Sequence, residues 1–253
     1  MGILSDGYVM GDRIGKGGFG TVYKAIKKLT DRTVAVKKLE RDKFPDRIEE
    51  EIRALERMRH RNIVQYYESF DEGGYKYIVM EYCEHGDLRS YLRRNGPLSD
   101  KEAAHVLSQL IDAVSYIHRQ MLMHRDLSTG NVLISHITRG VDDDEVKLEV
   151  KLTDFGLATV MRPGTKGAAA SVVGTPGFVA PQVYLENYSK EADVYSLGAL
   201  LYSMTTGKSP PDIRPSRREP QAELDLRSLS PEAADLIERM MCKDHKRRIQ
   251  LNG

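Results

Sequence analysis

The feature that most constrains the fold of this chain is a change in its hydrophobic pattern around residues 81–86. Before that point, short β-branched runs such as residues 34–37 and 77–80 alternate with turns, which predicts buried strands. One helix interrupts them, because residues 46–59 carry apolar side chains at helical spacing on a single face. A β-rich part of the chain therefore comes first, and a mainly helical part follows.

The helical part carries its own start signals. Ser99, followed three residues later by Glu102, has the pattern of a capping box before a helix predicted over residues 99–118. Further helices are predicted over residues 193–206 and 231–241. Strands followed by helices, with no internal repeat, indicate an α+β fold.

The overall composition excludes several classes of protein. A formal net charge of +1 gives no global field for nucleic acid or an acidic membrane surface, so neither partner is expected. No segment approaches the roughly 20 apolar residues of a membrane span. Two distant cysteines, Cys83 and Cys242, form no disulfide framework and no zinc cluster. A reducing location, in the cytosol or the nucleus, is expected.

A glycine-rich segment lies between two predicted strands and precedes Val22; its residues are Gly15, Lys16, Gly17, Gly18, Phe19 and Gly20. Because glycines lack side chains, backbone N–H groups in such a segment approach phosphate oxygens closely. A plain turn is one alternative, and the glycine turn of a dinucleotide-binding fold is another. That fold puts a helix after the glycines, whereas residues 21–23 continue as a strand.

Lys37 ends a β-branched run, and Glu51 lies on the helix predicted over residues 46–59. Glu49 and Glu50 are neighbouring candidates, but helical phase puts Glu51 on the side that faces the sheet. A Lys37–Glu51 pair would hold the ammonium group against the α- and β-phosphates of a nucleotide. An ordinary surface ion pair is the alternative.

The most informative segment is His124-Arg125-Asp126-Leu127-Ser128-Thr129-Gly130-Asn131. It resembles the protein kinase catalytic loop, H-R-D-L-x-x-x-N. Asp154-Phe155-Gly156 follows a strand-like run and resembles the D-F-G motif of the same family. With the glycine-rich segment, Lys37 and Glu51 in the same order, the chain is identified as a member of the eukaryotic protein kinase family from Tyr8 to about Leu251.

This resemblance implies a bilobal fold with Mg²⁺ and ATP in the cleft. The lobes are expected over about residues 8–82 and 87–253, with the final helix cut short at Gly253. Asp126 would accept the proton of the substrate hydroxyl, while Asn131 and Asp154 would bind Mg²⁺. Besides the glycine-rich segment, Lys37 and Glu51, the resemblance implies nucleotide contacts from Ile14, Val22, Ala35, Met80, Glu81, Cys83, Asp87 and Leu133.

The chain departs from the family pattern at several positions. Ser128 stands where serine/threonine kinases usually carry a lysine that contacts the γ-phosphate. Some Polo-like kinases of the centriole-duplicating branch also carry Ser there, and the chain is similar to them. Gln182 replaces the Glu of A-P-E, and its expected partner is Arg248. Residues 140–149 are predicted to form an acidic, solvated loop.

The resemblance also carries expectations about regulation and substrate. Asp193 would brace the catalytic loop, and Thr175 would bond to Asp126, as in serine/threonine kinases. Ser171 matches the usual activation site, where a phosphate would pair with Arg125; a residue of a flexible linker is the alternative. Expected partners are protein substrates with Ser or Thr, the kinase itself included. The location would be cytoplasmic, centrosomal or nuclear.

Two functions from different classes follow. The first is an active serine/threonine protein kinase, since Lys37, Glu51, Asp126, Asn131 and Asp154 are all present. The second is a pseudokinase, meaning a module that binds nucleotide or other proteins with little or no phosphate transfer. Only Ser128 and Gln182 support it.

Overall fold

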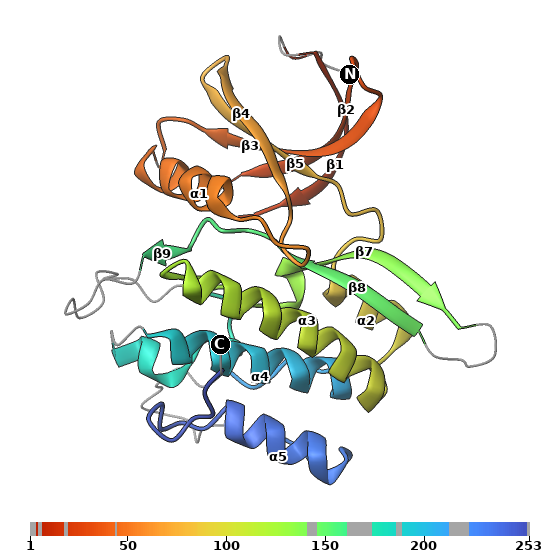
Figure 1. Ribbon diagram of the computed structural model, residues 1–253, viewed down its shortest axis with the longest axis vertical. Coiled ribbons are helices and arrows are strands. Elements are labelled where there is room, and N and C mark those ends of the chain that lie inside the picture. Colours follow the sequence, from red (N-terminus) through yellow and green to blue (C-terminus); the bar gives the residue numbers. More distant parts are fainter. Residues whose placement is uncertain are drawn as a thin grey trace.

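The N-terminal lobe is built on a five-stranded antiparallel sheet with strand order β1-β2-β3-β5-β4 (Figure 1). The computed structural model describes residues 4, 7–17, 20–43, 45–140, 146–160, 174–185, 189–212 and 223–251. The strands are β1 (Tyr8–Lys16), β2 (Thr21–Lys27), β3 (Arg32–Glu40), β4 (Tyr66–Glu72) and β5 (Tyr75–Glu81). The strands predicted over residues 34–37 and 77–80 are confirmed, since they form the buried centres of β3 and β5.

Helix α1 (Pro45–Arg57) lies beside this sheet (Figure 1). Proline is tolerated in the first turn because its missing N–H would have no partner within the helix there. The buried face of α1 carries Ile48, Ile52 and Leu55, as the helical spacing predicts. The same face carries one carboxylate, that of Glu51, into the protein.

Helices dominate the C-terminal lobe: α2 (Leu88–Asn95), α3 (Asp100–Arg119), α4 (Lys190–Thr206) and α5 (Pro231–Met240). The predicted capping box of α3 is present, with the Ser99 side chain accepting from the Glu102 N–H and the Glu102 carboxylate accepting from the Ser99 N–H. Helix α4 packs between α3 and α5 (Figure 1). It is buried on nearly every side because its sequence is apolar all round.

Short elements between the helices carry the sequence motifs: β6 (Leu122–Met123), η1 (Thr129–Asn131), β7 (Val132–Arg139), β8 (Val146–Leu152), β9 (Thr159–Val160) and η2 (Pro181–Leu185). The loop predicted over residues 140–149 is wrong in part, because β8 begins at Val146 and pairs with β7. Leu148 and Val150 alternate with polar residues and pack their buried face towards α3. Residues 141–145 lie outside the described residues.

One buried hydrophobic cluster runs through both lobes, from Ala35 on β3 to Met241 after α5. The segment 82–87 links β5 to α2 and is the connection between the lobes at this point. The predicted α+β fold with two lobes is confirmed, while the exact lobe boundaries stay a prediction. In the described part of the chain, every helix is too short or too polar to cross a membrane.

Candidate active site

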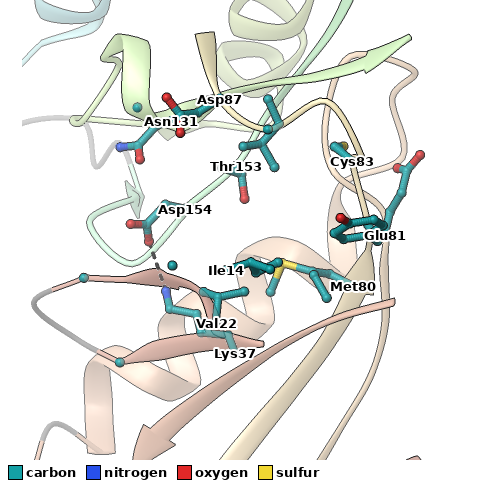
Figure 2. Close-up of a pocket in the computed structure, with 18 of the residues that line it drawn as sticks. Ile14, Val22, Lys37, Met80, Glu81, Cys83, Asp87, Asn131, Thr153 and Asp154 are labelled. Carbon is teal, nitrogen blue, oxygen red and sulfur yellow. Dashed lines mark hydrogen bonds and ion pairs between the residues drawn. The ribbon is translucent and has the colours of Figure 1, made fainter. Parts of the chain in front are cut away.

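A cavity of about 440 Å³ lies between the N-terminal sheet and the C-terminal lobe (Figure 2). Its volume is in the range of small-molecule and cofactor sites. The predicted site residues that line it are Ile14, Gly15, Lys16, Gly17, Gly20, Val22, Ala35, Lys37, Glu51, Met80, Glu81, Cys83, Asp87, Asn131, Leu133 and Asp154. Gly18, Phe19 and Ser171 lie outside the described residues.

Sequence reasoning missed other residues that line the cavity: Leu55, Tyr82, Glu84, Gly86, Gly130 and Thr153. Leu55 follows Glu51 by one helical turn, on the apolar face of the helix predicted over residues 46–59. Thr153 and Gly130 directly precede Asp154 and Asn131. Proximity to the motifs was therefore the signal that would have found these three.

Strand register explains how apolar and charged groups come to share the cavity. Side chains alternate across a strand, so Ala35 and Lys37 point to the same face of β3. Val22 is the partner of Lys37 in the β2–β3 ladder, which puts it over the same part of the cavity. Leu133 of β7 closes the cavity from the C-terminal lobe, where a bridge to Asp87 fixes it next to the start of α2.

Three charged side chains meet at one end of the cavity. The Lys37 ammonium donates to Glu51 Oε1 at 2.6 Å and to Asp154 Oδ1 at 3.0 Å. The expected Lys37–Glu51 contact is therefore present, and only 8% and 4% of these side chains are exposed. Figure 2 shows Asp154 reaching this ammonium from the C-terminal side of the cleft. The ion pair thus spans the two lobes.

Two carboxylates share this one ammonium group, and their pKa values reflect it. Burial alone would lower the pKa of Lys37, but Glu51 and Asp154 raise it, so the ammonium stays charged. Burial raises the pKa of Glu51 against the opposing effect of Lys37. Burial would also raise the pKa of Asp154, but the Lys37 charge and hydrogen bond hold it below its usual value. The site therefore carries excess negative charge that a cation would neutralise.

The backbone turns sharply at Asp154, which has a positive φ of 63°. Positive φ is uncommon for residues other than glycine and is frequent at functional sites. The turn sends Asp154 into the cavity and Phe155 into the core, where its ring lies 4.9 Å from the ring of His124. One short segment thus supplies a carboxylate to the cleft and an apolar anchor beneath it.

Asp126 lies just beyond the cavity lining, and two donors hold its carboxylate. Asn131 Nδ2 donates to Asp126 Oδ2 at 2.8 Å, and the Thr175 hydroxyl donates to Asp126 Oδ1 at 2.7 Å. The predicted Thr175–Asp126 bond is confirmed. These contacts fix the orientation of the Asp126 carboxylate relative to the cavity-lining Asn131.

The loop that carries Asp126 is braced from α4, as predicted for Asp193. The Asp193 carboxylate accepts from the N–H groups of His124 and Arg125, both at 3.0 Å, and contacts His118 Nε2 at 2.8 Å. Burial would raise the pKa of Asp193, but the His118 and backbone hydrogen bonds hold it below the usual value. Arg125 adopts φ 70°, a conformation that this brace supports.

Comparison with known proteins decides the family. The sequence matches the protein kinase domain over residues 8–252. The chain belongs to the protein kinase family. The resemblance read from the motifs is confirmed.

Two curated proteins similar to this kinase domain are serine/threonine kinases by name. Probable serine/threonine-protein kinase zyg-1 of Caenorhabditis briggsae is 50% identical over 239 residues, which cover 94% of this chain and 32% of that protein. Serine/threonine-protein kinase PLK4 of Drosophila grimshawi is 32% identical over 260 residues, or 97% of this chain and 32% of that protein. This chain therefore spans about a third of the length of these relatives, and PLK4 agrees with the predicted likeness to Polo-like kinases.

The replacement of Glu by Gln at position 182, in A-P-E, changes the hydrogen bonding around Arg248. Arg248 Nη2 donates to Gln182 Oε1 at 3.1 Å, which confirms the predicted partner. Arg248 also donates to the carbonyls of Cys242 and Glu191. Within the described residues, Gln182 Nε2 is buried without a hydrogen-bond partner. The Gln182 amide therefore accepts a hydrogen bond from Arg248 through its oxygen, while its own NH₂ group stays without an acceptor.

Ser128, where the family usually has lysine, is buried with 1% exposed. It precedes η1 and makes no side-chain cap there. It is not among the cavity-lining residues. Ser128 therefore brings no positive charge to the cavity.

Proposed function

We propose that this domain is a serine/threonine protein kinase that transfers the γ-phosphate of Mg-ATP to a Ser or Thr hydroxyl of a protein. The observation that carries the proposal is the ammonium of Lys37, held 2.6 Å from Glu51 and 3.0 Å from Asp154 at one end of the cavity. Phosphoryl transfer requires mainly positioning and charge neutralisation. This cavity offers both, and the names of the curated relatives support the choice of Ser or Thr as acceptor.

The donor set at the cavity fits a magnesium ion. Asp154 supplies a carboxylate, and the amide of Asn131 donates twice through Nδ2 to Asp126, which leaves Oδ1 as its acceptor atom. Mg²⁺ is typically bound by one or two protein oxygens, with phosphates and water completing the shell. Among the described residues, no cluster of three or more His, Cys, Asp or Glu would hold a metal without such help. Bound between Asn131 and Asp154, Mg²⁺ would neutralise charge on the phosphates.

Asp126 is the proposed proton acceptor. Its two oxygens are held by Asn131 and Thr175, so the carboxylate presents a fixed edge next to the proposed metal-binding residues. A substrate hydroxyl that reaches this edge would lose its proton to Asp126 as the phosphoryl group is transferred. The brace from Asp193 keeps the loop in place during this step.

The nucleotide would lie along the cavity with its adenine between the apolar residues Val22, Ala35 and Leu133. The backbone of segment 81–83, at the link between the lobes, would meet the edge of the ring. Lys37 would contact the α- and β-phosphates, while the N–H groups of the glycine-rich segment would cover them. Because Ser128 brings no charge, the γ-phosphate depends more on Lys37 and the metal. Ser171 remains the proposed activation site.

Transfer of labelled phosphate from ATP to casein and to the kinase itself tests this function. We expect the wild-type domain to transfer and Asp154→Asn to lose activity by about 100-fold or more, because a charged group that stabilises the transition state is removed. Asp235→Asn, on the exposed face of α5, is the control and should keep wild-type activity. Equal transfer by wild type and Asp154→Asn, at equal folded fraction, would contradict the proposal and favour a pseudokinase.

A further inference from the structure

Gly130 and Arg89 make an unusual contact beside the active site. A Cβ placed on Gly130 would lie 2.9 Å from Arg89 Cζ and closer still to Nη2. The guanidinium of Arg89 therefore occupies the space that a side chain at position 130 would take. Gly130 lines the cavity and directly precedes Asn131, so this cation stands at the edge of the catalytic loop.

Arg89 comes from α2, which packs against η1 and β7. Arg93 follows one turn later on the same helix, and residues four apart lie side by side on a helix surface. Both arginines are exposed. Neither has an ion pair or a hydrogen bond with any residue that the structure describes. The helix thus presents two uncommitted guanidinium groups, of which that of Arg89 lies beside Gly130 in the loop of Asp126.

The neighbouring polar groups do not neutralise this pair. Asp87, the closest acid in sequence, is committed to capping α2, where it accepts from the Ser90 N–H at 2.8 Å and from the Ser90 hydroxyl at 3.1 Å. Arg94, the third arginine of the helix, donates to the Ser90 carbonyl at 3.2 Å. The segment 126–131 contains no Lys or Arg. Arg89 is therefore a cation that α2 adds beside segment 126–131, which has no basic side chain of its own.

We propose that Arg89, assisted by Arg93, is a specificity-determining subsite that binds an acidic side chain of the protein substrate near the acceptor hydroxyl. This inference rests on the proposed kinase function. The fork of a guanidinium group matches a carboxylate or a phosphate with two parallel hydrogen bonds. Arg89 is not among the cavity-lining residues, which favours the substrate over the nucleotide as its ligand. The acidic group would be Asp, Glu or a phosphorylated Ser.

Peptide specificity tests this subsite. A set of Ser peptides, identical except for Asp, phosphoserine, Ala or Lys at one position on either side of the acceptor, would be compared by kcat/KM. We expect wild type to prefer Asp over Lys by about 10-fold at one or two adjacent positions, the range of one exposed charge-assisted contact. A higher kcat/KM for the phosphoserine peptide than for the Asp peptide would indicate substrates that are already phosphorylated at that position. Preference for the Asp peptide alone would indicate substrates with an acidic residue there. Arg89→Glu should reverse the preference, and Arg89→Lys should retain part of it.

Arg94→Glu is the matched control, since it makes the same charge change on the same helix and should leave the preference intact. Equal use of Asp and Lys peptides by an active wild-type enzyme would overturn the subsite while leaving the kinase function standing. Loss of ATP affinity in Arg89→Glu, with the peptide preference unchanged, would assign Arg89 to the nucleotide and would also overturn it. Binding of labelled Asp and Lys peptides, measured by fluorescence anisotropy, gives a readout that needs no phosphate transfer. Equal affinities there would count against the subsite even in an inactive enzyme.

Discussion

At the scale of single residues, the contact between Gln182 and Arg248 shows how a family position tolerates the loss of a charge. Arg248 keeps four hydrogen bonds, one of them to Gln182 and three to backbone carbonyls. Its guanidinium also lies 5.2 Å from the ring centroid of Tyr195. The unsatisfied group is Gln182 Nε2, which is buried and has no partner among the described residues. Leaving such a group unpaired is costly.

Gln182→Glu should therefore stabilise the domain. The new carboxylate would remove the unpaired N–H groups and face Arg248 with both oxygens, a gain of about 1–3 kcal/mol at neutral pH. Thermal unfolding measures the effect, which corresponds to a rise in Tm of several degrees. Asp235→Asn, which breaks an exposed i,i+4 pair with Arg239, should change the unfolding free energy by less than about 0.5 kcal/mol. A lower Tm for Gln182→Glu would show that burying the extra charge costs more than the pair returns.

At the scale of elements, a buried polar network joins the connection between α1 and β4 to the C-terminal lobe. Asn62 Nδ2 donates to Gln109 Oε1 of α3 at 2.9 Å and to the Val150 carbonyl of β8 at 2.8 Å. Gln109 accepts from the Val150 N–H at 3.0 Å and donates to the Leu148 carbonyl at 2.8 Å. The network therefore fixes the connection that follows α1, the helix that carries Glu51.

Gln109→Leu should destabilise the domain by about 2–5 kcal/mol, because it leaves several buried backbone and amide groups without partners. Urea unfolding measures the loss. The control is Ser108→Ala, at the neighbouring exposed position of α3, which removes one hydrogen bond to the His105 carbonyl and should cost under about 1 kcal/mol. Similar midpoints for both variants would contradict the network's contribution.

The same network shows where prediction from sequence stops. Local signals are strong at α1, where helical phase singled out Glu51, and at α3, where Ser99 and Glu102 form the capping box. Asn62 and Gln109 are 47 residues apart, and neither has a local pattern that points to the other. The likeness to kinases gave the roles of the motif residues but not this pair. The end of β8 was predicted as a strand-like run before Asp154, but its start at residues 146–149 was assigned to a loop because acidic side chains flank it.

At the scale of the whole molecule, the cavity takes its lining from both lobes, so a bound nucleotide would hold them together. The contact between Arg89 and Gly130 is a further feature that sequence reasoning missed, because it depends on how α2 packs on η1. The sequence therefore predicted most of the residues that line the cavity, but fewer of the contacts that these residues make with their neighbours. A ligand bound in the cavity would stabilise the folded domain through contacts with both lobes.

A non-hydrolysable ATP analogue with Mg²⁺ should raise the Tm of the domain. At a ligand concentration of about 100 Kd the stabilisation is about 2.7 kcal/mol, because the ligand binds the folded state alone. This corresponds to a rise of roughly 5–10 °C for a domain of this size. Removing the metal with EDTA should reduce the rise, and Asp154→Asn should make the rise insensitive to EDTA. An unchanged rise for wild type after EDTA treatment would contradict the proposed metal site.

The two carboxylate partners of Lys37 are synthesised at very different times, because they lie at different distances along the sequence. Glu51 follows Lys37 by 14 residues, whereas Asp154 follows it by 117. At roughly 5–20 residues per second, the ribosome delivers Asp154 about 6–23 s after Lys37. During that interval the emerging chain possesses the lysine and its helical partner but lacks the carboxylate proposed for the metal. Under the proposed function, an emerging N-terminal lobe therefore cannot complete the metal site before residue 154 of the C-terminal lobe has been made.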